Sequence, residues 1–350
     1  ISASHNPYPD NGIKFFAGTG YKLPDAVEDQ LEELVLSVED NLPRPTGQAL
    51  GTISHRPELL VDYVNFVADI VSADFSGLKV VVDCSHGAAY EVAPRLLKQL
   101  GAEVIVINAQ PTGCNINDNC GSTHLAGLQQ TVLEHKADIG IAHDGDADRC
   151  LAVDEQGQII DGDQIMVMCA LNLMKQGKLK DNTLVTTVMS NIGLHQAIKA
   201  AGGNVIVTPV GDRYVLEAMA ENGYVLGGEQ SGHIIFLDYN TTGDGVLTAL
   251  ELIAAVKQSG KKLSQMGALM TRYPQLLMNV RLKSKEGWDS NSAIAAAIAA
   301  GEEKLGDNGR ILVRPSGTEP LIRVMAEGPC QQELEQIVSQ IADVIKGELD

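Results

Sequence analysis

Two stretches of the chain repeat one plan of apolar runs and helical periods. In the first, apolar runs at 79–83, 103–107 and 137–142 surround a helical period at 89–100. In the second, runs at 184–189, 204–208 and 224–226 surround a helical period at 194–201. Short apolar runs that alternate with helical periods indicate βαβ units with parallel or mixed sheets. Ligand-binding loops of such sheets lie at the carboxyl ends of strands.

The pattern changes near residue 270 and predicts a separate small domain. An alternating strand at 276–282 is followed by a helix at 292–304, strands at 310–314 and 321–327, and a final helix from 332. Residues 25–36 have an acidic helical period, and 37–58 form a connector with scattered Pro and Gly. We therefore expect an α/β protein, with tandem βαβ-type domains, mixed sheets and a smaller C-terminal α+β domain. The expected domains are 1–58 (the remainder of a first domain, and the connector), 59–155, 156–271 and 272–350.

The composition of the chain argues against several classes of binding partner. The net charge of −19, from 26 basic and 45 acidic residues, argues against nonspecific binding to nucleic acids or anionic membranes. No apolar run approaches the roughly 18 to 20 residues of a membrane span. The six cysteines include no C-x-x-C pair, which indicates free thiols in a reducing cytoplasm. The chain does not begin with Met and opens as if at the end of a strand, so we expect that N-terminal sequence is missing.

The loop at 143–149 carries three carboxylates at alternate positions: Asp144, Asp146 and Asp148. Such carboxylates can converge on a hard cation, and they repel one another without one. With Glu155, the spacing imitates an EF-hand calcium loop, but Arg149 occupies the position that needs Gly, and both flanks are predicted strands. A magnesium site is favoured, with a metal-free acidic turn as the alternative.

Three other loops carry candidate chemistry. Ser4 and His5 stand before Asn-Pro, with Lys14 shortly after, which fits either a nucleophile or an ordinary turn. The Gly-rich loop 227–233 offers Glu229 and Ser231 to paired sugar hydroxyls, or forms a simple polar turn. The fourth loop fits a phosphate cradle or a structural hairpin, and its candidate residues are Arg314, Ser316, Gly317, Thr318 and Arg323.

Taken together and in this order, the four loops resemble the active-site loops of the α-D-phosphohexomutase family, over all 350 residues. The resemblance implies that Ser4 carries the transferable phosphate and Lys14 does acid/base work. It also implies that Mg²⁺ binds the three aspartates and a phosphoryl oxygen on Ser4. Ala147 replaces the second Gly of the family's D-G-D-G-D-R loop. The implied substrate-binding residues are Arg149, Glu229, Ser231, Arg314, Ser316, Gly317, Thr318 and Arg323, while His5 either assists the phosphoryl group or only makes a structural hydrogen bond.

The family resemblance also implies a reaction. A phosphorylated Ser4 would exchange its phosphoryl group with a phosphosugar through a hexosamine 1,6-bisphosphate. We expect a cytoplasmic enzyme, with a homodimer as its candidate assembly. The segments 2–5, 210–214, 228–231 and 314–320 are most similar to the amino-sugar branch of the family. The alternatives are a mutase for mannose or glucose phosphates with the same site, and a sugar-phosphate-binding protein that has lost catalysis.

Overall fold

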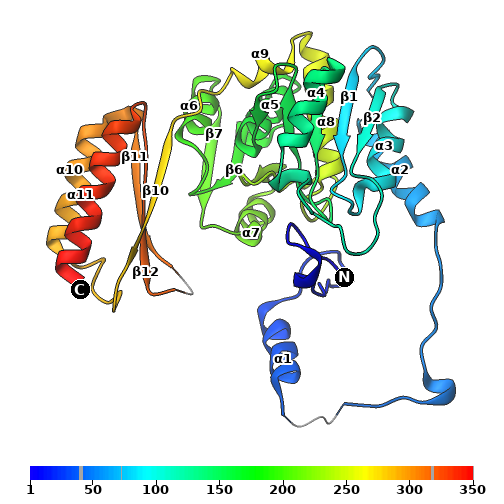
Figure 1. The fold of residues 1–350 in the computed structure, drawn as a ribbon, viewed down its shortest axis with the longest axis horizontal. Coiled ribbons are helices and arrows are strands. Elements are labelled where there is room, and N and C mark those ends of the chain that lie inside the picture. Colours follow the sequence, from blue (N-terminus) through cyan, green and yellow to red (C-terminus); the bar gives the residue numbers. More distant parts are fainter. Residues whose placement is uncertain (39–41, 72, 317–318, 350) are drawn as a thin grey trace.

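A computed structural model describes residues 1–38, 42–71, 73–316 and 319–349 (Figure 1). The first repeat forms a five-stranded sheet of order β2-β1-β3-β4-β5. Strands β1 (Lys79–Asp83), β2 (Glu103–Ile107) and β3 (Ile139–Ala142) are parallel. Strand β4 (Leu151–Asp154) pairs antiparallel with β3, and β5 (Ile159–Ile160) pairs antiparallel with β4. Helices α2 (Glu58–Val71), α3 (Ala89–Gln99) and α4 (Ala126–His135) accompany the sheet. The predicted mixed sheet is confirmed.

The second repeat has the same plan, with strand order β7-β6-β8-β9. Strands β6 (Thr183–Thr187), β7 (Asn204–Thr208) and β8 (Leu226–Gly228) are parallel, and β9 (Ile234–Phe236) returns antiparallel to β8. Helices α6 (Ile192–Ala200) and α7 (Asp212–Asn222) lie in the crossovers. The acidic loop joins β3 to β4, and the Gly-rich loop joins β8 to β9. The two loops therefore occupy equivalent positions in the two repeats.

Two long helices that the sequence pattern did not reveal pack between the repeats. In α5 (Gly162–Lys175) and α8 (Gly245–Ser259), buried residues occur all round the helix rather than on one stripe. A helix that is apolar on all sides shows no 3.6-residue periodicity. Both begin at an aspartate cap, since the Asp161 side chain accepts from Gln164 N and that of Asp244 accepts from Leu247 N. One continuous hydrophobic core joins the two repeats through these helices and the short α9 (Leu263–Gly267). The domain boundary at 155/156 stays a prediction.

The C-terminal domain has its own core. Its sheet has the order β10-β12-β11, all antiparallel, formed by β10 (Gln275–Arg281), β11 (Arg310–Pro315) and β12 (Leu321–Glu327). Helices α10 (Ser292–Leu305) and α11 (Gln331–Leu349) cover one face, where Ile322, Val324 and Ala326 are buried. Strand residues alternate between faces, so Arg323, Met325 and Glu327 lie on the other face.

The N-terminal segment forms a small folded patch and then an arm (Figure 1). Isolated bridges join Ser2 to Gly12 and Phe16 to Lys22. The arm contains the predicted acidic helix, α1 (Asp25–Leu36), which has no buried residue, and leads to α2. Among the described residues, no helix combines the length and the hydropathy that crossing a membrane requires.

The separate C-terminal core generates a stability prediction. Ile341 is 1% exposed on α11, so Ile341→Ala should cost about 2–5 kcal/mol in unfolding free energy, all of it within this domain. Differential scanning calorimetry should then show one transition at lower temperature while the transition of residues 59–271 keeps its midpoint. The exposed neighbour Asp343→Ala is the control. A uniform shift of the whole profile by Ile341→Ala would contradict two independent cores.

Candidate active site

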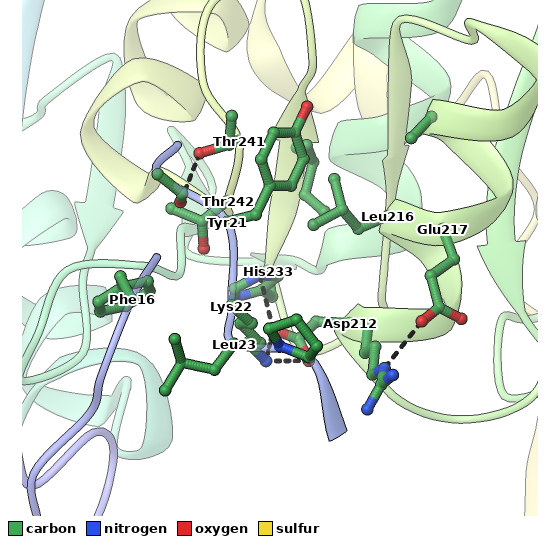
Figure 2. Close-up of a pocket in the computed structure, with 15 residues that line it drawn as sticks. Phe16, Tyr21, Lys22, Leu23, Asp212, Leu216, Glu217, His233, Thr241 and Thr242 are labelled. Carbon is green, nitrogen blue, oxygen red and sulfur yellow. Dashed lines mark hydrogen bonds and ion pairs between the residues drawn. The ribbon is translucent and has the colours of Figure 1, made fainter. Parts of the chain in front are cut away.

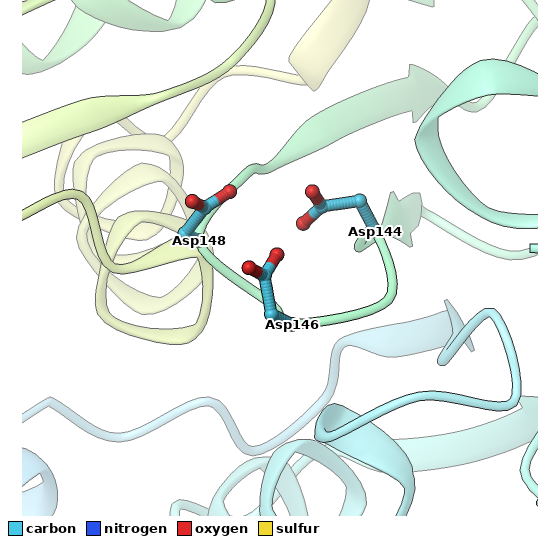
Figure 3. Close-up of side chains that lie close together, drawn as sticks. All are labelled: Asp144, Asp146 and Asp148. Carbon is cyan, nitrogen blue, oxygen red and sulfur yellow. The ribbon is translucent and has the colours of Figure 1, made fainter. Parts of the chain in front are cut away.

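The three aspartates of the β3–β4 loop point at one another (Figure 3). One carboxylate oxygen from each of Asp144, Asp146 and Asp148 lies within 4.8 Å of the other two. Three buried oxygens have no hydrogen-bond partner, namely Oδ2 of Asp144, Oδ1 of Asp146 and Oδ1 of Asp148. Buried carboxylate oxygens without partners are costly unless a cation neutralises them. The donor set therefore fits a hard divalent cation such as Mg²⁺.

The electrostatics of the loop also fit a cation-binding site. Burial, followed by the charges of Asp148 and Asp146, raises the pKa of the Asp144 carboxyl. Burial acts in the same direction on Asp148, but the contact with His233 and the charges of Lys14 and Arg149 outweigh it and lower the Asp148 pKa. The loop thus places Asp144, whose pKa is raised, beside Asp148, whose pKa is lowered. A bound cation would favour the ionised form of both.

The serine loop docks directly on the metal loop. Gly145 N donates to Ser4 O at 3.0 Å, and the Asn117 side chain donates to the carbonyls of Ser4 and Asn6, both at 2.8 Å. A Cβ at Gly145 would lie 2.5 Å from Ser4 O, so only glycine permits this approach. Ser4 itself has φ 51°, a strained value for serine. Its hydroxyl lies 3.2 Å from His5 Nδ1.

The Asp146 carboxylate of the metal loop accepts hydrogen bonds from two side chains of the N-terminal segment that carries Ser4. Its Oδ2 accepts from Ser2 Oγ at 2.7 Å and from Lys14 Nζ at 2.6 Å, and Lys14 Nζ is 3.7 Å from Asp148 Oδ2. Ser2 Oγ in turn accepts from Ser4 N at 2.8 Å. Burial lowers the Lys14 pKa, but its bond to Asp146 and the surrounding carboxylates outweigh burial and raise it overall. Lys14 is therefore a cation in this arrangement.

The Gly-rich loop lies on the other side of the metal loop. Cys150 N donates to Gly232 O at 3.0 Å, and a β-bridge joins Arg149 to His233. Ser231 Oγ is buried and has no hydrogen-bond partner, while Glu229 Oε1 accepts from Gly211 N at 3.1 Å. A buried hydroxyl without a partner invites a polar ligand. The predicted sugar loop thus adjoins the predicted metal loop.

His233, to which the sequence analysis gave no role, connects the metal loop with the N-terminal segment. It is buried, with Nδ1 3.5 Å from Asp148 Oδ2 and Nε2 3.6 Å from Asp212 Oδ2. Asp212 Oδ2 also accepts a hydrogen bond from Lys22 Nζ at 2.7 Å, in a pocket between α7 and residues 16–24 (Figure 2). The histidine follows the Gly-rich motif directly in sequence, which was the available signal.

The cationic pair of the C-terminal domain is set by strand register. Arg314 of β11 and Arg323 of β12 are direct partners across the strand pair. Burial and the charge of Arg323 lower the Arg314 pKa, and Arg323 Nε is buried without a hydrogen-bond partner. Lys285 Nζ donates to the carbonyls of Ser316 and Glu319, which supports the loop. Two arginines held together favour an anion between them.

The structure brings together three of the four loops. Among the described residues, no hydrogen bond or ion pair joins Arg314 or Arg323 to the serine or metal loop, and Arg314 contacts the second repeat at Met189 Sδ, 3.7 Å from Nη2. Gly317 and Thr318, the centre of the predicted phosphate cradle, lie outside the described residues. Ser2 and Asn117 are positioning residues that the sequence analysis missed, because their partners are over 110 positions away.

Comparison with known families gives a match along the whole fold. Four models of the phosphoglucomutase/phosphomannomutase family match in order: α/β/α domain I at 1–41, α/β/α domain II at 61–157, α/β/α domain III at 161–273 and the C-terminal domain at 277–344. Each of the four loops falls within a different one of these matches. The order of the loops along the chain is therefore the order of the family's domains.

Individual relatives agree. The phosphoglucosamine mutase of Symbiobacterium thermophilum is 56% identical over 349 residues, which cover all of this chain and 78% of that protein. A phosphoglucomutase/phosphomannomutase family protein of Burkholderia thailandensis has the same fold, with TM-score 0.77 and 23% identity over 99% of this chain and 75% of that one. Aspergillus fumigatus N-acetylphosphoglucosamine mutase, solved with GlcNAc-6P and magnesium, gives TM-score 0.67 and 20% identity over 82% and 66%. The chain therefore belongs to the phosphoglucomutase/phosphomannomutase family, the α-D-phosphohexomutases, and its sequence similarity groups it with the phosphoglucosamine mutases.

Proposed function

We propose that this chain interconverts glucosamine 6-phosphate and glucosamine 1-phosphate through a phosphoserine at Ser4. The main supporting observation is the set of three buried aspartate oxygens that have no hydrogen-bond partner, beside the docked serine loop. Relatives with 53–56% identity that are named phosphoglucosamine mutase support the choice of substrate. The acidic loop favours Mg²⁺ held by Asp144, Asp146 and Asp148. When bound, that ion would neutralise charge on the transferring phosphoryl group.

Two phosphoryl transfers make up the proposed reaction. In the first, the bond from phosphorus to Ser4 Oγ breaks as a bond to the sugar 1-oxygen forms. Lys14, once deprotonated, or a neighbouring group takes the sugar hydroxyl proton, and the leaving Ser4 Oγ takes up a proton. The product is glucosamine 1,6-bisphosphate. After the sugar turns over, the 6-phosphoryl group transfers to Ser4 Oγ, which loses its proton, and the 6-oxygen takes a proton. Glucosamine 1-phosphate leaves, and Ser4 is again phosphorylated.

The remaining loops hold the sugar in both orientations. Arg314, Ser316 and Arg323, together with Gly317 and Thr318, would bind the phosphate that is not being transferred. Glu229 and Ser231 would bind hydroxyls near the middle of the ring, because these contacts must serve both orientations. Arg149 would face the phosphosugar from the metal loop. Lys14 is an ammonium bonded to Asp146 in this arrangement, so it must lose a proton before it can accept the one from the sugar hydroxyl.

The phosphoserine generates the first functional prediction. Ser4→Ala should abolish turnover, since no other group would carry the phosphoryl group, while binding of glucosamine 6-phosphate should change little. Coupled mutase assays and calorimetric titration measure the two quantities. Ser2→Ala is an informative comparison, because it removes the bonds to Ser4 N and Asp146 but leaves the nucleophile. Activity of Ser4→Ala within a factor of ten of wild type would sink the phosphoserine.

The buried acid of the metal loop generates a prediction on stability and metal binding. Folding raises the Asp144 pKa, so the metal-free protein loses stability as the pH rises from about 3.9, the ordinary value, toward the raised one. Asp144→Asn removes that penalty and should raise the Tm of metal-free protein at neutral pH. It should also raise the Mg²⁺ concentration for half-maximal activity roughly tenfold or more, since a charged ligand is lost. Activity that survives chelation unchanged would show that the loop is no metal site.

Substrate choice is tested separately. We expect kcat/KM to be higher for glucosamine 6-phosphate than for glucose or mannose 6-phosphate, with residual activity on glucose 6-phosphate. Discrimination of one substituent is modest unless the site hydrogen-bonds it. Parallel assays of the three substrates decide the question. An equal or higher kcat/KM for glucose or mannose 6-phosphate would leave the mutase chemistry but overturn the amino-sugar assignment.

A further inference from the structure

The face of the C-terminal sheet opposite α10 and α11 carries two pairs of charged side chains at different positions along its strands. Register pairs Glu327 of β12 with Arg310 of β11 and Gln275 of β10, and pairs Arg323 with Arg314. The two sets are four residues apart on the same strands and therefore share one face. At 3.2–3.4 Å per residue they are separated by about 13 Å. Contacts that hold Glu327 and Arg310 in place therefore also position Arg314 and Arg323, which are proposed to bind phosphate.

Glu327 is fully buried against the second repeat. Its carboxylate accepts from Arg310 Nε at 2.6 Å, from Gln275 Nε2 at 2.8 Å and from Ile192 N at 3.0 Å. The last bond puts the carboxylate at the N-terminus of α6, where the helix dipole favours a negative charge. Arg310 Nη2 donates to Ser190 O at 2.6 Å. The ion pair therefore joins the C-terminal domain to the segment just before α6.

Asn191 holds the connection between the two domains. Its side chain donates to Tyr273 O at 2.9 Å and accepts from Tyr273 N at 3.1 Å, and Tyr273 lies in the linker before β10. The same side chain lies 3.4 Å from Glu327 Oε1. A Cβ at Gly193 would lie 1.8 Å from Thr271 O, so the linker runs tightly along α6. The linker and the ion pair meet at Asn191.

Asp163 continues the contacts to the Gly-rich loop. Its Oδ2 accepts from Asn191 N at 2.8 Å and from Gln230 Nε2 at 3.1 Å, and Asp163 is fully buried on α5. Gly162 N also donates to Gln230 O at 3.0 Å. Gln230 stands between Glu229 and Ser231, the two residues proposed to bind the sugar. A continuous set of polar contacts therefore leads from that loop to the C-terminal sheet.

We infer that Arg310, Glu327, Asn191, Asp163 and Gln230, the interdomain chain, set the distance between the sugar-binding loop and the phosphate-binding arginines. Asp163 and Glu327 are then positioning residues of the reaction. The inference rests on the functions proposed for those two loops. A buried ion pair contributes little net stability compared with an apolar replacement, but it fixes one arrangement of its partners. A sugar that binds in two orientations needs that fixed distance in both.

A double-mutant cycle tests the coupling. Gln230→Met and Glu327→Gln alter opposite ends of the interdomain chain. The matched controls are Gln258→Met, which removes a surface hydrogen bond, and Glu333→Gln, which removes a surface ion pair. Gln230→Met and Glu327→Gln should each raise KM for the sugar phosphate about tenfold and change kcat less, because binding in both orientations is weakened. The double variant should be no more than about twofold worse than the poorer single variant.

Independent effects would instead multiply to roughly a hundredfold, as expected of distant sites without a shared network, and that result would overturn the inference. Unchanged KM in both single variants would overturn it as well. Circular dichroism and Tm identify a variant that fails to fold. Arg310→Lys, which keeps the charge but loses the geometry of the bonds to Glu327 and Ser190 at the same end, then replaces Glu327→Gln in the cycle.

Distance measurements test the inference without turnover. Of the six cysteines, only Cys114 of the first repeat and Cys330 beside α11 are exposed, so nitroxide labels on these two report the separation of the domains by double electron–electron resonance. Gln230→Met should broaden the Cys114–Cys330 distance distribution, although Gln230 belongs to neither labelled domain. Gln258→Met should not.

A distribution unchanged by both Gln230→Met and Glu327→Gln would overturn the interdomain chain. This readout needs no substrate. If the wild-type protein has no mutase activity, the proposed function fails. The distance distributions still decide whether the interdomain chain sets the separation of the domains.

Discussion

The mutual repulsion of three carboxylates at the end of β3 is the constraint around which this active site is built. Asp144 is buried at the loop's first position, and its two companions follow at alternate residues, so the fold holds together groups that repel one another. The surrounding structure supplies the opposing forces. Lys14 approaches from the serine loop, and His233 from the Gly-rich loop. The serine loop and the Gly-rich loop thus each contact the acidic loop through one nitrogen-bearing side chain.

Backbone contacts reinforce this convergence. The serine loop is fixed on the Gly145 amide and the Asn117 side chain, and the Gly-rich loop is fixed on the Cys150 amide. The two arginines proposed to bind phosphate are different, since they stand on a sheet with its own hydrophobic core. Their position depends on a few buried polar contacts around Glu327 rather than on a shared core. The site therefore combines three loops on one body with a fourth loop on another.

Much of this was predictable from local sequence. Strands such as 79–83 and 103–107 have short β-branched runs, and the acidic motif fixes three ligands within five residues. Helices α5 and α8 were missed because burial on all sides erases helical periodicity. Ser2 and Asn117 were missed for another reason. Their roles come from partners brought close by the fold, and a hydroxyl or an amide in a loop carries no local sign of such a partner.

The equivalence of the β3–β4 and β8–β9 hairpins has a consequence for the history of the molecule. Both connect the last parallel strand of a sheet to its first antiparallel strand, and both face the same centre. If one ancestral unit was copied in tandem, the two turns descended from a single turn and then diverged. One copy gained carboxylates for a cation, and the other gained glycines, an acid and a hydroxyl for a ring of alcohol groups. Gene duplication would thereby have supplied two adjacent turns, from which the two halves of a bipartite site then developed.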